Sequence, residues 1–214
     1  GGRLPCKGTE LIIGKRSSPS SHMAIVIDSN AQRCSTSNLG AFVIKLPDQV
    51  RRPELAFTGR VLLPQTVLER TLSRNSEMSV LLFKVSSLRS QKTVAVGVES
   101  FTAAEGQIVI PNWVADYLEV KPLERVSLMC SGFTAAREVI FQPLTSDFNK
   151  LQNPRVILEK TLRDFPCLTL GTFIPIRFGR QTYELKVVRL DPGPMATIVQ
   201  ADVVTDFARP LDSF

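Results

Sequence analysis

The sequence predicts a two-lobed protein of mixed class, in which a small duplicated β-barrel is followed by a small α+β lobe. Two observations point to the barrel: a nine-residue pattern that occurs twice, 47 positions apart, and a run of alternating valines after residue 93. A third points to the second lobe, because turn residues and a helix signal replace the strand pattern near residue 141. At 214 residues the chain is long enough for both lobes to bury a core.

Residues 1–46 differ in composition from the rest of the chain. They carry six Lys and Arg against two acids, and Lys15–Ser21 is rich in serine. This composition is typical of a disordered tail, but a basic, Ser-rich, acid-poor segment also fits an organelle-targeting region. Both interpretations stay open, and Ala24–Ile27 is an aliphatic run that can add a strand to a neighbouring sheet.

The barrel lobe is predicted over residues 47–141 and rests on the repeat. Val61–Glu69 and Ile108–Asp116 share three aliphatic residues, a proline, an amide, a free position, a valine, an aliphatic residue and an acid. Each copy predicts a short buried strand that ends at its proline and turns into a short helix. Neither unit can bury its apolar face alone, so the two are expected to close on one another around a pseudo-twofold axis.

Further strands of the barrel follow from their hydrophobic patterns. Val94, Val96 and Val98 alternate with small or polar residues, which is the period of a strand with one buried face. The other predicted strands are Val80–Val85, Arg125–Met129 and Glu138–Phe141.

The α+β lobe is predicted over residues 142–214. Asn153 and Pro154 are a helix start, with Asn as N-cap and Pro at the first helical position, and the helix is expected over about 153–165. Three strands should then form a small sheet, and their centres are Thr172–Arg177, Tyr183–Leu190 and Ala196–Val204.

Composition argues against several classes of function. The net charge is +6, but residues 47–214 carry 20 basic and 18 acidic residues, so no nucleic-acid partner is expected. No stretch of the sequence reaches 18 consecutive apolar residues, so no membrane-inserted segment is expected. The four cysteines form no C-x-x-C pair and the only histidine is His22, so neither a metal nor another cofactor is expected.

Active-site motifs of enzymes are also missing. Aspartic proteases on a related barrel need Asp-Thr-Gly or Asp-Ser-Gly, a self-processing decarboxylase needs Gly-Ser, and none of these occurs. The glycines form neither a G-x-G-x-x-G nor a P-loop pattern. The sequence therefore predicts a binding module that is not an enzyme.

A series of short runs in the chain matches one known family. The series includes Phe101–Gly106 and Ile110–Trp113. It continues through Phe141–Phe148, Asn153–Phe165, Cys167–Gly171, Tyr183–Leu185 and Asp202–Leu211. With these runs the chain resembles the N-terminal domain of the ubiquitin fusion degradation protein one family, and the similarity covers roughly residues 53–214 in one order.

The resemblance implies a double-psi β-barrel lobe followed by an α+β lobe. It also implies an adaptor that binds ubiquitin and polyubiquitin chains. With a heterodimer partner of the nuclear protein localisation four family, the adaptor delivers ubiquitylated substrates to a hexameric AAA ATPase of the valosin-containing type. In that family the segments that bind this partner and the ATPase follow the present domain, so they are expected outside this chain.

Two alternatives remain beside this expectation. The domain can be a scaffold lobe that binds the heterodimer partner or the ATPase and hardly contacts ubiquitin. The family implies a cytoplasmic and nuclear protein that acts at the endoplasmic reticulum surface, whereas a targeting role of residues 1–46 would imply a plastid-derived organelle.

A candidate ubiquitin-binding surface lies near the C-terminus. Ubiquitin presents a small apolar patch ringed by Lys and Arg, so its receptor should expose an aliphatic side chain between acids. Strand alternation over Val199–Phe207 places Asp202, Val204 and Asp206 on one face. We therefore expect these three residues to contact ubiquitin.

Overall fold

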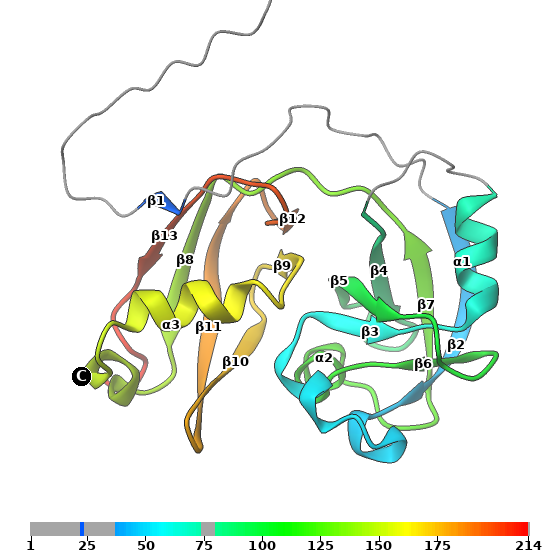
Figure 1. The fold of residues 1–214 in the computed structure, drawn as a ribbon, viewed down its shortest axis with the longest axis horizontal. Coiled ribbons are helices and arrows are strands. Elements are labelled where there is room, and N and C mark those ends of the chain that lie inside the picture. The colour runs from blue at the N-terminus through cyan, green and yellow to red at the C-terminus, as the bar shows by residue number, and fades with distance from the viewer. Residues whose placement is uncertain (1–21, 24–36, 74–79, 214) are drawn as a thin grey trace, which may run out of the picture.

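The computed structural model describes residues 22–23, 37–73 and 80–213, which form two lobes lying side by side (Figure 1). The first lobe is a closed six-stranded barrel, and the second is a five-stranded sheet with helices and a separate two-stranded ribbon. This architecture confirms the predicted fold class, a double-psi β-barrel lobe followed by an α+β lobe.

The barrel strands lie in the order β2-β6-β3-β5-β4-β7. Their bounds are β2 Ser37–Lys45, β3 Arg60–Leu62, β4 Leu82–Ser87, β5 Thr93–Ser100, β6 Gln107–Val109 and β7 Arg125–Cys130. Between them lie the 3-10 turns η1 (Pro47–Val50) and η2 (Pro53–Phe57) and the helices α1 (Gln65–Leu72) and α2 (Asn112–Leu118).

The sequence repeat forms the two halves of this barrel. β2 runs parallel to β6 and β5 runs parallel to β3, while β3 and β6 meet antiparallel at Leu62 and Val109. In both copies the proline, Pro64 or Pro111, is extended and the helix begins at the next residue. The strand–proline–helix interpretation and the pseudo-twofold arrangement are therefore confirmed.

The predicted start of the barrel at residue 47 is wrong. Residues 37–45 form β2, and Leu39, Phe42 and Ile44 on that strand are buried in the barrel core. The two halves of the barrel correspond strand for strand, β3 to β6. Because β5 precedes β6 in the second half, the first half needs a strand before β3, and β2 is that strand. The predicted Ala24–Ile27 strand lies outside the described residues, and the tail and targeting interpretations of the preceding part of the chain stay predictions.

The second lobe begins before the predicted boundary at residue 142. Its sheet has the order β1-β13-β8-β11-β10, so β8 belongs here and not to the barrel. The bounds are β1 His22–Met23, β8 Glu138–Pro143, β10 Phe173–Phe178, β11 Gln181–Asp191 and β13 Val203–Phe207. The predicted assignment of Glu138–Phe141 to the barrel fails because Val139 and Phe141 are buried against the second core.

The helix and the last strand also differ in extent from the prediction. The helix α3 spans Pro154–Leu162, and Asn153 occupies the N-cap position in a left-handed conformation without a side-chain cap bond. The single strand predicted over Ala196–Val204 is two strands: β12 (Met195–Thr197) pairs with β9 (Cys167–Thr169), and β13 begins at Val203. Gln200 has a φ of 57° and turns the chain between them.

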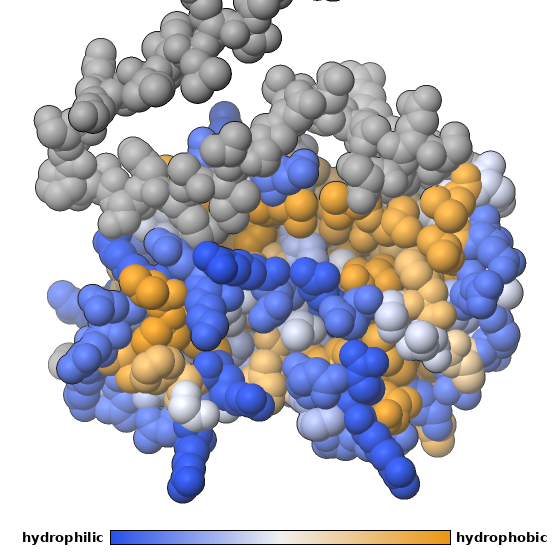
Figure 2. Space-filling model, in the orientation of Figure 1, coloured by the Kyte–Doolittle hydropathy of each residue, from blue (hydrophilic) through white to orange (hydrophobic). Residues whose placement is uncertain are grey.

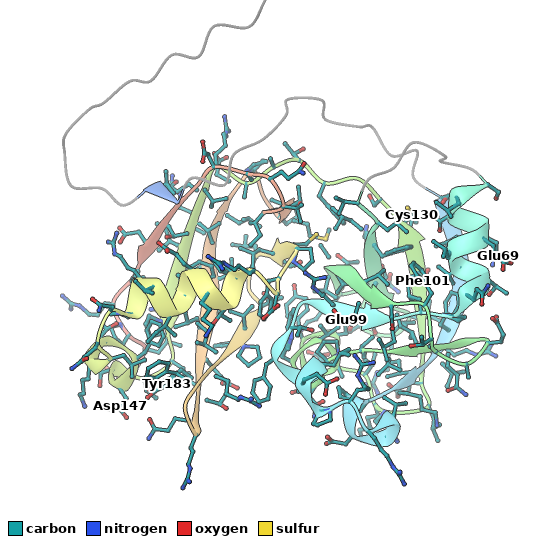
Figure 3. All side chains as sticks on the ribbon, in the orientation of Figure 1. Glu69, Glu99, Phe101, Cys130, Asp147 and Tyr183 are labelled. Carbon is teal, nitrogen blue, oxygen red and sulfur yellow. The ribbon has the colours of Figure 1, made fainter. Side chains whose placement is uncertain are left out.

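The core of the second lobe lies between the sheet and α3. Ile157, Leu158 and Leu162 of the helix contact the buried face of the sheet. Phe148 on the 3-10 turn η3 (Ser146–Lys150) packs edge-on against Tyr183 in this core, with 5.7 Å between ring centroids. Figure 3 labels Tyr183 and, on the same 3-10 turn, Asp147.

The two lobes share a packed junction. Trp113 of α2 packs against both cores, and its ring centroid lies 5.9 Å from that of Phe165. Its indole N–H donates a hydrogen bond to the carbonyl oxygen of Thr58 at 2.9 Å. Nearby, Arg60 lies 3.8 Å from Glu99, which Figure 3 labels.

Apolar side chains continue across the junction on the face seen in Figure 2, where orange atoms gather between the lobes. Leu82 and Ala95 of the barrel bury Cys167 of the second lobe, and Val80, Phe133 and Met195 pack around this cluster. The backbone N–H of Ala95 donates a buried hydrogen bond of 3.0 Å to the hydroxyl of Thr169. A packed cluster and a hydrogen bond therefore hold β5 against β9.

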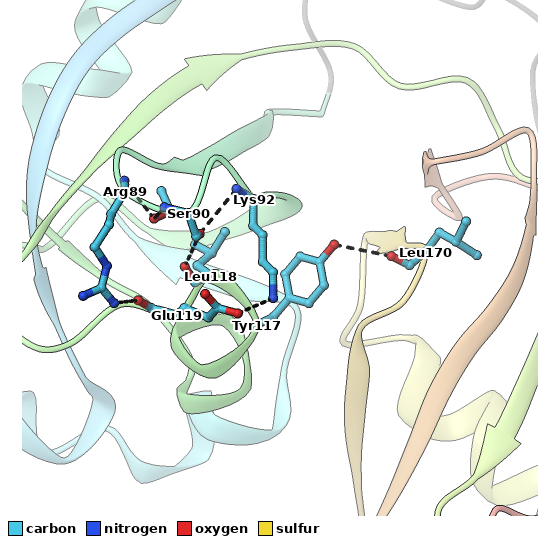
Figure 4. Close-up of polar contacts among 8 residues, drawn as sticks. Arg89, Ser90, Lys92, Tyr117, Leu118, Glu119 and Leu170 are labelled. Atoms are coloured by element: carbon cyan, nitrogen blue, oxygen red, sulfur yellow. Dashed lines mark hydrogen bonds and ion pairs between the residues drawn. The ribbon is translucent and has the colours of Figure 1, made fainter.

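A polar network joins the β4–β5 turn to the end of α2 (Figure 4). Arg89 donates a 2.6 Å hydrogen bond to the carbonyl of Glu119, and Ser90 donates one of 2.7 Å to the carbonyl of Leu118. These donors satisfy carbonyls that the helix leaves unpaired at its C-terminus. On the same turn of helix, the hydroxyl of Tyr117 reaches the carbonyl of Leu170 in the second lobe at 3.5 Å.

Candidate functional site

The sheet of the second lobe has one buried face and one open face. Alternate residues of its central strands are buried beneath α3. They include Val139, Phe141, Leu185, Val187 and Val203. Because successive side chains of a strand point to opposite faces, the residues between them form the open face. The predicted ubiquitin-binding residues belong to this side of the lobe.

The strand register places acids and aliphatic residues in alternation on the open face. β13 and β8 run parallel, with Val204 opposite Glu138 and Asp206 opposite Ile140. The two aliphatic residues are therefore diagonal neighbours, and each lies beside an acid. We call Glu138, Ile140, Val204 and Asp206 the outer patch.

Exposure within the outer patch agrees with a contact surface. Val204 is 40% exposed and Asp206 is exposed, while Glu138 and Ile140 are half-buried. A valine with this exposure contributes little to the core beneath the sheet. The outer patch therefore offers exposed apolar area that a binding partner can bury.

The structure brings together two of the three predicted site residues. Val204 and Asp206 share the open face of β13, whereas Asp202 is exposed but precedes the strand by one residue. Whether these residues contact ubiquitin stays a prediction.

Sequence analysis missed Glu138 and Ile140 as members of this surface. Both were assigned to a barrel strand, so no argument placed them beside β13. The signal that could have found them is the alternation of half-buried Glu138 and Ile140 with buried Val139 and Phe141, which marks a sheet with one open face.

Arginines surround the acids of the outer patch. Arg155 at the start of α3 lies 3.6 Å from Asp206, and Arg189 on β11 lies 3.1 Å from Glu138. These side chains are at least one-third exposed, and exposed ion pairs of this kind contribute little to stability. Both carboxylates therefore remain accessible to a basic partner, which can replace the arginine without a large penalty.

Within residues 37–73 and 80–213 no group of three or more His, Cys, Asp or Glu side chains could hold a metal ion. Cys130 and Cys167 are both buried, and burial raises the pKa of the Cys167 thiol well above its usual value. A thiol with a raised pKa is a poor nucleophile at neutral pH. Among the helices of the described part of the chain, none is both long and apolar enough to span a membrane.

Comparison with protein families divides the chain into the same two lobes. Residues 37–132 match the model described as ubiquitin fusion degradation protein UFD1, N-terminal subdomain 1, and residues 135–210 match that of N-terminal subdomain 2. The chain belongs to this family. The resemblance found in the sequence is confirmed, and the matched ranges agree with β2 as part of the first lobe and β8 as part of the second.

Curated relatives of the family come from distant eukaryotes. The chain is 37% identical over 155 residues to the ubiquitin fusion degradation protein 1 homolog of Dictyostelium discoideum. The matched region covers 72% of this chain and 47% of the relative. It is 32% identical over 160 residues to the human ubiquitin recognition factor in ER-associated degradation protein 1, and this match covers 75% of this chain and 52% of the relative. The chain thus spans about half the length of these relatives.

Proposed function

We propose that this domain is a non-catalytic ubiquitin-binding module of an adaptor in ubiquitin-dependent protein degradation. The outer patch is the observation that supports it, and the names of the family and of its human relative agree with it. An exposed valine beside a half-buried isoleucine forms a small apolar centre. The acids Glu138 and Asp206 adjoin that centre, and Asp202 lies just beyond it.

The chemistry of the two surfaces is complementary. The apolar patch of ubiquitin would bury Val204 and Ile140, while its surrounding Lys and Arg would lie near Asp202 and Asp206. Burial supplies affinity, and the charges supply orientation and a faster association rate. A single surface of this size predicts weak binding to one ubiquitin and stronger binding to a chain whose units reach several sites.

The wider assignment rests on the family alone. By this assignment, the domain works with a partner of the nuclear protein localisation four family and delivers ubiquitylated substrates to a hexameric AAA ATPase. The compartment would be the cytoplasm and nucleus at the endoplasmic reticulum surface, or a plastid-derived organelle if the N-terminal residues are a targeting remnant. Since the chain spans about half of its relatives, the contacts with the partner and the ATPase belong to the whole protein.

An NMR titration of the labelled domain with ubiquitin tests the proposed site. Replacing Val204 by lysine puts a charge at the centre of the contact, and we expect binding to weaken about tenfold or more. Val156 on α3 is 61% exposed and lies outside the outer patch, so Val156→Lys is the matched control and should bind as the unchanged domain does.

The same spectra decide between this function and the scaffold alternative. If Val204→Lys keeps a native spectrum and binds ubiquitin unchanged, the outer patch is not the site. If the unchanged domain binds neither ubiquitin nor linkage-defined ubiquitin chains in a pull-down, the domain is a scaffold lobe for the heterodimer partner or the ATPase.

A further inference from the structure

The edge of the second sheet is formed by β13 and is covered over a short length only. β1 consists of His22 and Met23 and pairs antiparallel with β13, with His22 opposite Val204 and Met23 opposite Val203. These two residues are about 180 positions away from β13 in the sequence. The other strands of this sheet all come from Glu138 onward, so the sheet pairs with a strand from a distant part of the chain.

The hydrogen bonds of β13 show which backbone groups face that edge. The N–H groups of Val204 and Ala208 donate to Arg137 and Phe141, toward β8. Since backbone groups alternate in direction along a strand, the N–H and C=O of Val203 and Thr205 point the other way, toward the edge. At Phe207 the N–H is bonded to the carboxylate of Asp206 at 2.8 Å, which closes the edge there.

We propose that this edge of β13 is a strand-addition site for an extended, basic peptide segment of a partner protein, which displaces β1. Backbone pairing at Val203 and Thr205 would provide the contact, as in other complexes where a peptide extends a sheet. Thr205 lies beyond the two residues that pair with β1. The main contact of this site is the backbone at the edge and not the open face, although Asp202 and Asp206 adjoin both surfaces.

The charge of the partner follows from the groups around the edge. Asp202 and Asp206 are exposed on either side of the paired residues, and only Asp206 has an ion pair, with Arg155, among the described residues. No Lys or Arg lies within five residues of His22 and Met23 in the sequence, so β1 brings no basic residue to these carboxylates. A competing segment needs an extended backbone without proline at the paired positions, and a basic residue near each aspartate gives it an attraction that β1 lacks.

Proline substitutions in β1 can open the edge and provide a matched control. Met23 lies opposite Val203, whose backbone faces β1, so this pair is the hydrogen-bonded one and Met23→Pro removes its donor. His22 lies opposite Val204, whose N–H points to β8, so His22→Pro removes no bond to β13. In hydrogen exchange the amide of Val203 should lose protection in Met23→Pro and keep it in His22→Pro.

The probe for the site is a fluorescent synthetic peptide with the sequence of residues 16–27 in which Ser20 and Ala24 are replaced by lysine, added to the full chain. In the register of β1 these two lysines lie opposite Asp206 and Asp202. Because a resident strand lowers the apparent affinity of its competitor, we expect binding roughly tenfold tighter for Met23→Pro than for His22→Pro. Asp206→Lys in the Met23→Pro background should abolish most of this binding. Chemical shifts should change at Val203 and Thr205.

The proposal is overturned if the peptide binds neither variant, if it binds both equally, or if the shifts that it causes lie away from β13. A concentration-dependent dimer of Met23→Pro would assign the edge to a second copy of the chain instead of a partner peptide. Ile140→Ala removes an apolar contact of the outer patch on β8 and no group at the edge, so it should weaken ubiquitin binding and leave peptide binding as in its parent. A failure of ubiquitin binding and a failure of strand addition therefore remain distinguishable.

Discussion

Gly97 on β5 shows how the junction between the lobes constrains a single residue. A Cβ atom placed on Gly97 would lie 2.5 Å from Cγ of Pro166. Pro166 has little freedom to move away, because its carbonyl accepts hydrogen bonds of 3.0 Å from Ile198 and from Thr197. The barrel strand can approach the second lobe only without a side chain at this position.

Gly97→Ala is therefore expected to lower the free energy of unfolding by about 1–3 kcal/mol, the usual cost of overpacking a fitted contact. Urea unfolding followed by circular dichroism measures it. In a Pro166→Ala background the same substitution should cost less, because the opposing ring atoms are gone. An equal cost in both backgrounds would contradict the contact with Pro166.

At the scale of elements, the β4–β5 turn stabilises the end of α2 through side chains. Besides Arg89 and Ser90, Lys92 contributes: its ammonium lies 2.7 Å from the carboxylate of Glu119 and 5.5 Å from the ring centroid of Tyr117. The hydrogen bond from Lys92 lowers the pKa of Glu119 below its ordinary value of 4.5. The ionised form of Glu119 is thus favoured in the folded state.

The pH dependence follows from the direction of this shift. A carboxyl with a lower pKa in the folded state stabilises the fold fully above its unfolded pKa, and this contribution is lost as pH falls through the folded pKa. As pH falls from about 6 to about 3, we expect the free energy of unfolding to decrease less in Glu119→Gln than in the unchanged chain. The difference should be small, and added salt should reduce it. Urea unfolding at both pH values measures it.

Lys92→Met provides the control for this ion pair. It removes the donor and should flatten the same part of the pH profile as Glu119→Gln does. If either variant keeps the profile of the unchanged chain, Lys92 is not the origin of the shift.

At the scale of the whole molecule, the junction should make the two lobes unfold together. Cys130 lies in the barrel core, and Cys167 lies in the cluster between the lobes. Separating the lobes would break the hydrogen bond from Ala95 to Thr169 and expose this cluster. Partial opening would therefore cost a large share of the total stability.

Thiol labelling measures this coupling in two variants that keep only Cys130 or only Cys167. With iodoacetamide in increasing urea, we expect both thiols to give the same opening free energy and the same dependence on urea. Faster labelling of Cys167 with little dependence on urea would mean that the lobes separate while the barrel stays folded.

Sequence patterns predicted most of the elements because these elements are local. The repeats at Leu63–Pro64 and Ile110–Pro111 predicted two strand–helix units correctly, since proline and hydrophobic periodicity act within a few residues. The boundaries failed at Leu39 and Val139, because a strand alone does not reveal which sheet it joins. The predicted strand over Ala196–Val204 failed for a similar reason, since the turn at Gln200 interrupts a continuous apolar pattern.

The sequence by itself determined the family, the duplicated barrel and the order of the two lobes, because these depend on short-range patterns and a long series of matched residues. Only the tertiary structure decided the surroundings of Val204. Parallel pairing of β13 with β8 brings Glu138 and Ile140 beside it, more than 60 residues away in the chain. Register between distant strands is set by the packing of both buried faces, and no local pattern specifies it.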